Sequence, residues 1–253
     1  MAGGDGRAVL VTGGSRGIGR AIARAFAERG DRVAVHYGTS RDRAEAVLAE
    51  LPGDGHALVQ ADLADAEAVG SMVDAAADAL GGLDVLVNNA GVFTDSPPLS
   101  SSYEHWQEVW ARTLAVNLVG AANATFRAVP HLQASGGGAV VNVSSRGAFR
   151  GEPDNPAYGA SKAGLNAFAQ SMALALAPVG ISVTCVAPGH VQTELADDAL
   201  DGPSGDAVRA QSPFGRVARP EEVAAAVLWL SSPEARFSTG TIVDVNGASY
   251  LRS

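Results

Sequence analysis

The amino-acid sequence predicts one α/β domain, in which a doubly wound, mostly parallel sheet of about seven strands carries helices on both faces. Short apolar runs alternate along the chain with segments whose apolar residues recur at helical spacing. No linker, repeat or low-complexity segment divides residues 1–253, so a single domain is expected to span them. Hydrophobic residues at 47% and charged residues at 18% also provide enough apolar surface for one large core.

Seven short apolar runs are predicted to be strands, and the segments between them to be helices. The predicted strands are Ala8–Val11, Val33–Val35, Ala57–Val59, Leu83–Val87, Ala139–Val143, Ile181–Val186 and Thr241–Val245. The predicted helices are Arg20–Arg29, Arg41–Leu51, Asp65–Leu80, Tyr103–Leu132, Pro156–Leu176 and one that begins at Pro220. Asp65 suits a helix N-cap and Pro220 suits the first helical position. Because strands alternate with helices, neighbouring strands are expected to run parallel.

The first strand continues directly into a glycine-rich turn. The turn reads Thr12-Gly13-Gly14-Ser15-Arg16-Gly17-Ile18-Gly19, and a helix follows it. Glycines at 13, 17 and 19 leave room for backbone N–H groups and a helix N-terminus to approach a phosphate. Such glycines can also be purely structural, but their place after the first strand favours a dinucleotide-binding site.

The only lysine of the chain lies four residues after a tyrosine. Of 18 basic residues 17 are arginine, and the exception, Lys162, follows Tyr158 at a spacing that puts both side chains on one face of a helix. A nearby cation favours phenolate and lowers the pKa of a tyrosine from its usual value of about 10. The pair therefore predicts proton transfer to or from a substrate oxygen. Taken alone, the pattern is weak, and a solvated pair without a role is the alternative.

Five motifs together resemble one protein family. They are Thr12–Gly19, Asn88–Gly91, Ser145, Tyr158–Lys162 and Pro188–Gly189, in this order along the chain. Over nearly its whole length the chain resembles the short-chain dehydrogenase/reductase family, and it is similar to the family's 3-oxoacyl-acyl-carrier-protein reductases. The resemblance implies a Rossmann-type fold and an enzyme that interconverts a carbonyl and an alcohol with a nicotinamide cofactor.

The resemblance also implies a role for each of four polar residues. Tyr158 would be the acid-base group, and Lys162 would lower its pKa and hold the nicotinamide ribose. Ser145 would bind the substrate oxygen, whereas Ser144 remains an alternative from the residues alone. Asn117 would anchor a water molecule of a proton relay, and its apolar neighbours predict that it is buried and hydrogen-bonded.

Further residues are implied to bind the cofactor. Asp62 would accept a hydrogen bond from the adenine, and residues 188–193 would line the nicotinamide carboxamide. Asn88 would have the structural role of tying strands together. The cofactor-binding residues implied in this way are Gly13, Ser15, Arg16, Gly17, Ile18, Gly19, Tyr37, Ser40, Arg41, Asp62, Leu63, Asn89, Ala90, Gly91, Tyr158, Lys162, Pro188, Gly189, Val191 and Thr193.

The end of the second strand predicts NADP(H) as the cofactor. An NAD-dependent enzyme would place an acid there, about 20 residues past the glycine turn, to bind the ribose 2′-OH. The sequence from His36 to Arg41 contains no acid, and the first one is Asp42. Arg16, together with Ser40 and Arg41, stands where a 2′-phosphate would be received.

Charge and hydropathy limit the partners and the location. A net charge of −9 disfavours nucleic acids and anionic membranes as partners. No apolar run approaches the roughly 18 residues of a membrane span, and Met1–Gly6 is too short and polar for a signal peptide, so a cytoplasmic location is expected. The single cysteine, Cys185, is expected to be a buried strand thiol, and no metal site is predicted.

Assembly is predicted from the resemblance. Family members are mostly tetramers or dimers, so a homo-oligomer is expected, with a tetramer favoured. The contact would use the apolar faces of the helical segments Tyr103–Leu132 and Pro156–Leu176. Near the C-terminus the family often has Asp-Gly-Gly where this chain has Asn246-Gly247-Ala248, a departure in a segment that usually belongs to a subunit contact.

The surroundings of the predicted site favour a small free substrate. Residues 193–216 correspond to the substrate lid of the family, and acids gather there and before the tyrosine. These acids are Glu152, Asp154, Glu194, Asp197, Asp198, Asp201 and Asp206, while the stretches Val129–Gly138 and Leu174–Ile181 contain no lysine or arginine. An acidic carrier protein would be repelled, so a free carbonyl or alcohol is expected.

Three alternatives remain from the sequence. The first is a 3-oxoacyl-acyl-carrier-protein reductase. The second is a nucleotide-sugar epimerase or dehydratase, which usually has a longer C-terminal domain. The third is a non-catalytic NADP-sensing module, which would lose catalytic groups that are all present here.

Overall fold

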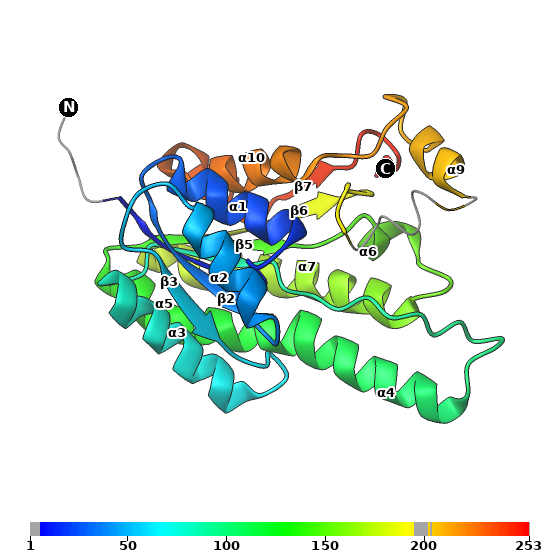
Figure 1. Ribbon diagram of the computed structural model, residues 1–253, viewed down its shortest axis with the longest axis horizontal. Coiled ribbons are helices and arrows are strands. Elements are labelled where there is room, and N and C mark those ends of the chain that lie inside the picture. Colours follow the sequence, from blue (N-terminus) through cyan, green and yellow to red (C-terminus); the bar gives the residue numbers. More distant parts are fainter. Residues whose placement is uncertain (1–5, 195–201, 203, 253) are drawn as a thin grey trace.

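The computed structural model describes residues 6–194, 202 and 204–252. Within them, seven strands form one sheet in the order β3-β2-β1-β4-β5-β6-β7, and each of the six neighbouring pairs runs parallel. Helices cover both faces of the sheet (Figure 1). The predicted doubly wound sheet is confirmed, and the described strands are parallel throughout.

The strands and helices follow the predicted order. The strands are β1 (Ala8–Val11), β2 (Arg32–Tyr37), β3 (Ala57–Gln60), β4 (Val85–Asn88), β5 (Gly138–Val143), β6 (Ile181–Pro188) and β7 (Ile242–Val245). The helices are α1 (Gly17–Ala27), α2 (Arg41–Glu50), α3 (Ala66–Leu80), α4 (Tyr103–Leu114), α5 (Ala121–Ala134), α6 (Gly147–Arg150), α7 (Pro156–Leu176), α9 (Gly205–Ala210) and α10 (Pro220–Leu230). Two short 3₁₀ segments are η2 (Ala177–Val179) and η3 (Pro233–Ser238). Helices α6 and α9 were not expected, because four and six residues are too few to show a helical period.

The strands are buried on both faces because two helical layers pack against them. In β1, Leu10 belongs to a core that includes residues of α3, α5 and α7. Its neighbours Val9 and Val11 belong to a second core with residues of α1, α2 and α10. Successive side chains of a strand point to opposite faces, which explains why this strand is apolar at every position.

Polar side chains also hold the sheet where the sequence suggested them. The carboxylate of Asp65 accepts hydrogen bonds from the backbone N–H groups of Glu67 and Ala68, as expected of the N-cap of α3. The side-chain amide of Asn88 donates to Asn142 Oδ1 and to Thr125 Oγ1, both at 3.0 Å. Asn88 therefore ties β4 to β5 and to α5, which confirms its predicted structural role.

The predicted helix Tyr103–Leu132 is interrupted by a π-helical segment, η1 (Ala115–Gly120), between α4 and α5. Gly120 packs against the loop between β3 and α3, where an added Cβ would lie 2.5 Å from the backbone oxygen of Leu63. Segments of this kind occur most often at functional sites. Here the segment carries Asn117, one of the four predicted catalytic residues.

Ala248 occupies a backbone conformation that favours glycine. Its φ is +59°, the only positive value among described residues other than glycine, and it stands where related sequences often have a second glycine. We expect Ala248→Gly to raise the free energy of unfolding by about 0.5 kcal/mol, because relief of the left-handed strain exceeds the added entropy of the unfolded chain. Thermal unfolding measures this change. The matched control is Ala175→Gly on the exposed face of α7, which is expected to lower stability by about 1 kcal/mol. Equal destabilisation by both changes would contradict the interpretation.

None of the helices in the described part of the chain is long and apolar enough to cross a membrane. Cys185 lies buried in β6, as predicted.

Candidate active site

A cavity of about 530 Å³ lies at the carboxyl ends of the strands, beside the glycine turn. The strand order reverses between β1 and β4, and ligands of such sheets bind at this point. Helix α1 begins here at Gly17, and no side chain caps its N-terminus. Its first backbone N–H groups therefore remain available for an anionic ligand.

Two glycines of the turn have no room for a side chain. A Cβ at Gly19 would lie 2.1 Å from the carbonyl oxygen of Gly13. Gly13 itself has a φ of +64°, and a Cβ there would lie 2.9 Å from the Cα of Ala90. The close approach of β1, α1 and the turn after β4 thus requires glycine at both positions.

Side chains from two neighbouring strands hold the turn in place. The amide of Asn89 donates to the carbonyl oxygens of Thr12 at 2.9 Å and Gly13 at 3.1 Å. Nδ1 of His36 accepts from the backbone N–H of Gly13 at 3.0 Å, while its Nε2 lies 3.1 Å from Ala61 O. Burial lowers the pKa of His36, so its imidazole is neutral and donates through Nε2 to Ala61. This structural role of His36 was not predicted from the sequence, although a histidine in an otherwise apolar strand indicates a buried, hydrogen-bonded side chain.

Most of the predicted cofactor-binding residues line this cavity. They are Gly13, Ser15, Arg16, Gly17, Ile18, Gly19, Ser40, Asp62, Leu63, Asn89, Ala90, Gly91 and Thr193. The lining residues that were not predicted are His36, Gly38, Thr39, Gln60, Ala61, Val92, Arg112, Val116 and Glu194. The lining mixes polar groups of the glycine turn with apolar side chains, and the backbone N–H groups at the start of α1 are uncapped, which fits a phosphate-bearing dinucleotide.

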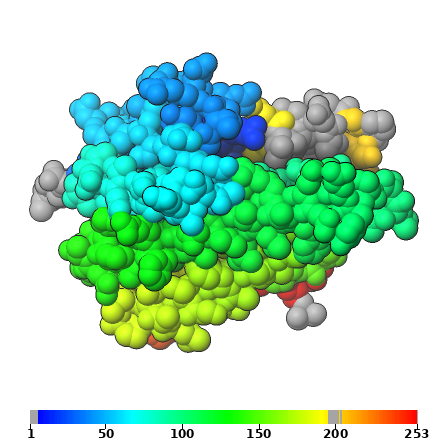
Figure 2. Space-filling view, turned by 90° about the horizontal axis from the view of Figure 1, so that it is seen from below, coloured from blue at the N-terminus to red at the C-terminus, as the bar shows by residue number. Residues whose placement is uncertain are grey.

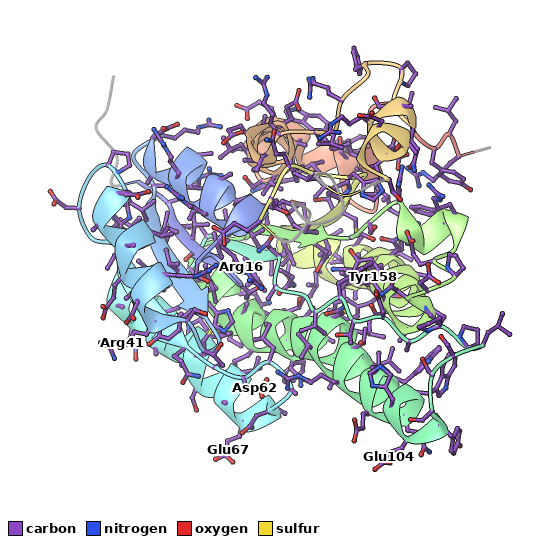
Figure 3. All side chains as sticks on the ribbon, turned by 45° about the vertical axis from the view of Figure 1, so that its right-hand side comes forward. Arg16, Arg41, Asp62, Glu67, Glu104 and Tyr158 are labelled. Carbon is purple, nitrogen blue, oxygen red and sulfur yellow. The ribbon has the colours of Figure 1, made fainter. Side chains whose placement is uncertain are left out.

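Seven predicted cofactor-binding residues do not line the cavity, and they are Tyr37, Arg41, Tyr158, Lys162, Pro188, Gly189 and Val191. The guanidinium of Arg41 donates to Glu45 at 2.8 Å along α2. Arg16 makes no ion pair with any described residue and lies nearer the centre of Figure 3, whereas Arg41 lies at its edge. Of the two arginines, only Arg16 lines the cavity.

Two ion pairs join segments at the rim of the cavity. Arg112 of α4 donates to Asp62 at 2.9 Å, and this contact lowers the pKa of Asp62. Arg43 of α2 donates to Glu194 at 2.5 Å, and this contact links α2 to the start of the predicted lid. All four side chains are more than half exposed, so each pair contributes little to stability.

Ser145, Tyr158 and Lys162 come together at the ends of β5 and α7. A hydrogen bond joins Ser145 to the phenol of Tyr158, and Ser145 Oγ accepts from the backbone N–H of Gly147 at 3.0 Å. The ammonium of Lys162 lies 5.7 Å from the centroid of the Tyr158 ring. Ser144 is buried, and its hydroxyl lies 3.4 Å from the backbone oxygen of Lys162, turned away from this group. The geometry therefore favours Ser145 over Ser144.

The pKa of Tyr158 is raised in this structure and not lowered as the sequence suggested. Burial is the main cause, the hydrogen bond with Ser145 acts against it, and the carboxylate of Glu152 adds to it. Lys162 does not offset the shift, because its ammonium donates to the backbone oxygen of Val143 at 2.8 Å. Burial lowers the pKa of Lys162 itself to about 8.

Asn117 is buried and fully hydrogen-bonded, as its apolar neighbours predicted. Its Oδ1 accepts from the backbone N–H of Val92 at 2.8 Å, and its Nδ2 donates to Val92 O at 3.0 Å and to Ser161 Oγ at 3.1 Å. A Cβ at Gly91 would lie 3.3 Å from Asn117 Oδ1 and 3.5 Å from Lys162 Nζ. Asn117, Lys162 and the turn after β4 thus meet at one point.

Comparisons with known proteins agree with this geometry. The family model described as enoyl-(acyl carrier protein) reductase matches residues 13–248. A 3-oxoacyl-(acyl-carrier-protein) reductase FabG of Staphylococcus aureus is 37% identical over 247 residues, 97% of this chain and 98% of the relative. The chain belongs to the short-chain dehydrogenase/reductase family. It is accordingly an oxidoreductase that acts on the alcohol and carbonyl groups of its substrate.

Two further members of the short-chain dehydrogenase/reductase family show its breadth. A cis-4-hydroxycyclohexanecarboxylate dehydrogenase of Sinomonas cyclohexanicum is 40% identical over 243 residues, 95% of each chain. The crystal structure of a short chain dehydrogenase from Burkholderia cenocepacia J2315 in complex with NADP has a TM-score of 0.87 and 37% identity, and the match covers 97% of this chain and 98% of that one. Membership favours the oxidoreductase over the epimerase and sensing-module alternatives.

The predicted nicotinamide segment of this family member runs from the end of β6 to the glycine turn, and of its predicted residues only Thr193 lines the cavity. Pro188 ends the strand and accepts from the backbone N–H of Arg146 at 2.9 Å. Gly189 packs against the C-terminal segment, where a Cβ would lie 3.1 Å from the Cα of Asn246. Val191 is buried, and Thr193 lies close to the glycine turn, 3.2 Å from where a Cβ of Gly17 would be. The segment therefore connects the two predicted halves of the site.

The predicted lid, residues 193–216, is described only in part. Residues 195–201 and 203 lie outside the described residues, and with them Asp197, Asp198 and Asp201. The rest includes α9 and the turn after it, which ends near Phe214, an exposed side chain.

Proposed function

We propose that this short-chain dehydrogenase/reductase uses NADP(H) to interconvert a carbonyl and an alcohol on a small free molecule. The observation that carries the proposal is the meeting of Ser145, Tyr158 and Lys162 beside a cavity that ends in an uncapped helix N-terminus. The glycine turn and α1 would hold the pyrophosphate, and the segment from Pro188 to Thr193 would hold the nicotinamide. When bound, the nicotinamide supplies or accepts the hydride.

The proton step falls to the side chains of this chain. Tyr158 gives its hydroxyl proton to the carbonyl oxygen in reduction and takes it back in oxidation. Ser145 donates a hydrogen bond to the same oxygen and fixes its distance from the phenol. The ammonium of Lys162 donates to Val143 O in this structure; it would favour the phenolate of Tyr158 once it turns to hold the nicotinamide ribose. Asn117 holds the turn that carries Gly91 and Val92 through its two hydrogen bonds to Val92, joins it to α7 through Ser161, and would anchor the water of a proton relay.

NADP(H) is favoured over NAD(H) by the wall of the cavity next to α1. Gly38, Thr39 and Ser40 form this wall at the end of β2, and no carboxylate stands among them to bind a ribose 2′-OH. Arg16, whose guanidinium makes no ion pair with the residues that the structure describes, lines the same cavity. A bidentate arginine contact suits a 2′-phosphate.

The second candidate function is a 3-oxoacyl-carrier-protein reductase, which the Staphylococcus aureus relative favours. The contacts of four nearby arginines argue against a docking surface for an acidic carrier protein. Arg127 is engaged with Asp74, Arg209 with Asp206, and Arg146 is buried. Arg150 alone of these four is exposed without an ion pair among the described residues, so electrostatic steering of a carrier protein would be weak.

Kinetics with matched substrates distinguish the two functions. We expect NADPH oxidation with small ketones, and we expect a KM for acetoacetyl-carrier protein no lower than that for the matching free thioester. The physical reason is the net charge of −9 together with the ion pairs of Arg127 and Arg209, which leave Arg150 alone of the four arginines exposed and without an ion pair among the described residues. A KM for the carrier-bound substrate that is tenfold or more below that of the free thioester would establish the second candidate. Failure of all ketones and alcohols in a broad panel with both cofactors would count against the proposed function itself.

We further propose a homo-oligomer, with a tetramer favoured. Figure 2 shows α4 and α5 in green and α7 in yellow-green, side by side on one face of the molecule. Trp106 and Trp110 of α4 are half-buried with their rings 5.5 Å apart, and Phe126 of α5 is 78% exposed. Such an apolar helical face supports pairing with a second copy.

A further inference from the structure

Arg146 is a buried cation that the proposed proton step does not use. It directly follows Ser145, and only 5% of its surface is exposed. Its guanidinium donates to Ser249 Oγ and to Gln211 Oε1, each at 2.7 Å, and both acceptors are neutral. No carboxylate forms an ion pair with Arg146 in the described part of the chain. A buried charge without a counter-ion is costly, and strongly perturbed charged groups cluster at functional sites.

A second guanidinium converges on the same neutral acceptor. Arg150, one turn later, donates to the same Oε1 of Gln211 at 3.2 Å. Two positive groups thus share a single amide oxygen, although like charges repel at such distances. Their repulsion and the burial of Arg146 both act to lower the pKa of Arg146. The arrangement is electrostatically incomplete within the described chain.

The surroundings leave these charges without compensation. Arg146 lines a cavity of about 210 Å³ together with His190, whose pKa is lowered to about 4 by burial and by both arginines, so the histidine is neutral. The two carboxylates in the wall of this cavity are already bonded elsewhere. Glu222 is paired with Arg216, and Asp244 with Arg252. Glu152 acts on Arg146 only through space, since the two form no ion pair.

The position of the two arginines relates them to the substrate. Arg146 directly follows Ser145, the residue whose hydroxyl would bind the substrate oxygen, so the Cα atoms of the two residues lie about 3.8 Å apart. Gln211 lies in the predicted lid just after α9, and Arg150 is exposed, so the group can be reached from solvent. Glu152 acts on the pKa of both Arg146 and Tyr158, which places the buried guanidinium and the phenol within electrostatic range of one carboxylate.

We propose that Arg146 and Arg150 form a carboxylate subsite, and that the substrates of this enzyme are oxo acids or hydroxy acids whose carboxylate replaces Gln211 as the shared acceptor. The inference rests on the proposed function, since it names the substrate class of the same site. A carboxylate accepts from guanidinium groups more strongly than an amide oxygen does. Binding would therefore neutralise the buried cation while Ser145 and Tyr158 hold the carbonyl oxygen at the other end.

Paired substrates test the subsite. Linear oxo acids with two to five carbons between ketone and carboxylate are each compared with their methyl esters, which keep the ketone and lose the charge. We expect kcat/KM with NADPH to be at least about tenfold higher for the best acid than for its ester. Arg150→Gln, at an exposed position that folding tolerates, is expected to reduce this ratio severalfold. The control is Arg29→Gln, which removes a positive charge from an exposed residue just after the C-terminal end of α1. It is expected to leave the ratio of acid to ester unchanged.

Gln211→Glu is the most informative variant. It places a carboxylate of nearly the same shape against both guanidinium groups and so replaces the substrate's charge with one from the protein. We expect this variant to unfold several degrees above the wild type, because a buried cation gains its counter-ion. We also expect its ratio of acid to ester to fall to one or below. Its folding does not depend on removing a buried residue, which makes the result interpretable.

A measurement without turnover separates the subsite from the proposed function. Sodium acetate, compared with sodium chloride at equal ionic strength, is expected to raise the unfolding temperature of the wild type and to leave that of Gln211→Glu unchanged. Equal effects of acetate on both proteins would overturn the subsite, as would esters and acids reduced with equal kcat/KM. Ketone and ester turnover without preference for the acids would leave the proposed function standing and remove this inference alone. Stabilisation by acetate with no turnover of any ketone, acid or ester would retain the anion site but refute both the proposed function and the substrate class.

Discussion

Lys162→Arg is expected to remove nearly all turnover, with a loss in kcat of about 100-fold or more, while the protein stays folded. Lys162 is buried beside Tyr158, and its compact ammonium donates to Val143 O at 2.8 Å. Arginine keeps the charge, but its planar fork is larger and cannot take the same place against the phenol and the ribose. The steady-state rate with a responsive ketone, measured at equal folded content by circular dichroism, is the test. Turnover within a few-fold of the wild type would refute the proposed Tyr158–Lys162 mechanism.

The control for folding is Lys162→Met, which removes the charge but fills the space. Because burial lowers the pKa of Lys162 from 10.5 to about 8, the ammonium costs stability below pH 8, by up to about 3 kcal/mol. Between pH 8 and 10.5 the unfolded chain binds more protons than the folded one, so the stability of the wild type should rise with pH there. The methionine variant lacks this rise and is expected to be inactive, yet no less stable at pH 7. Tyr158→Phe is its companion and should abolish the proton step while it still binds NADP(H).

Arg16→Gln is expected to lower the preference for NADPH over NADH by about 10- to 100-fold, measured as the ratio of the two kcat/KM values. Arg16 stands at the start of α1, is exposed in the larger cavity and has no ion pair within the described chain. Its charge would therefore be directed at the 2′-phosphate, which NADH lacks. The loss should appear mainly as a higher KM for NADPH, with little change for NADH.

Two exposed arginines serve as controls for this prediction. Arg20 lies one turn further along α1 and pairs with Glu50, and Arg41 pairs with Glu45. Arg20→Gln should leave the cofactor preference unchanged. Arg41→Gln tests the sequence-based expectation that this residue also receives the phosphate, and its engagement with Glu45 predicts a smaller effect than that of Arg16→Gln. A wild-type preference for NADH would refute the NADP(H) proposal altogether.

The sequence by itself determined the fold class, because the information is local. Each strand is a short apolar run and each long helix shows its own period, so β1 and α7 are found at their predicted bounds. Glycine spacing likewise predicts the turn before α1, since a left-handed φ and contact between backbones at Gly13 and Gly19 admit little else. Helices α6 and α9 escaped because they are shorter than two turns.

The tertiary structure alone decided the contacts that join residues far apart in the chain. Strand register, not spacing, brings His36 of β2 against Gly13 of the turn, and the packing of α4 beside the loop after β3 brings Arg112 against Asp62. Gln211 meets Arg146 across 65 positions, which nothing in the local pattern of either segment could indicate. Burial, too, depends on the whole fold. The four-residue spacing of Tyr158 and Lys162 predicted that the two would be neighbours, but desolvation by the surrounding core set the direction of both pKa shifts.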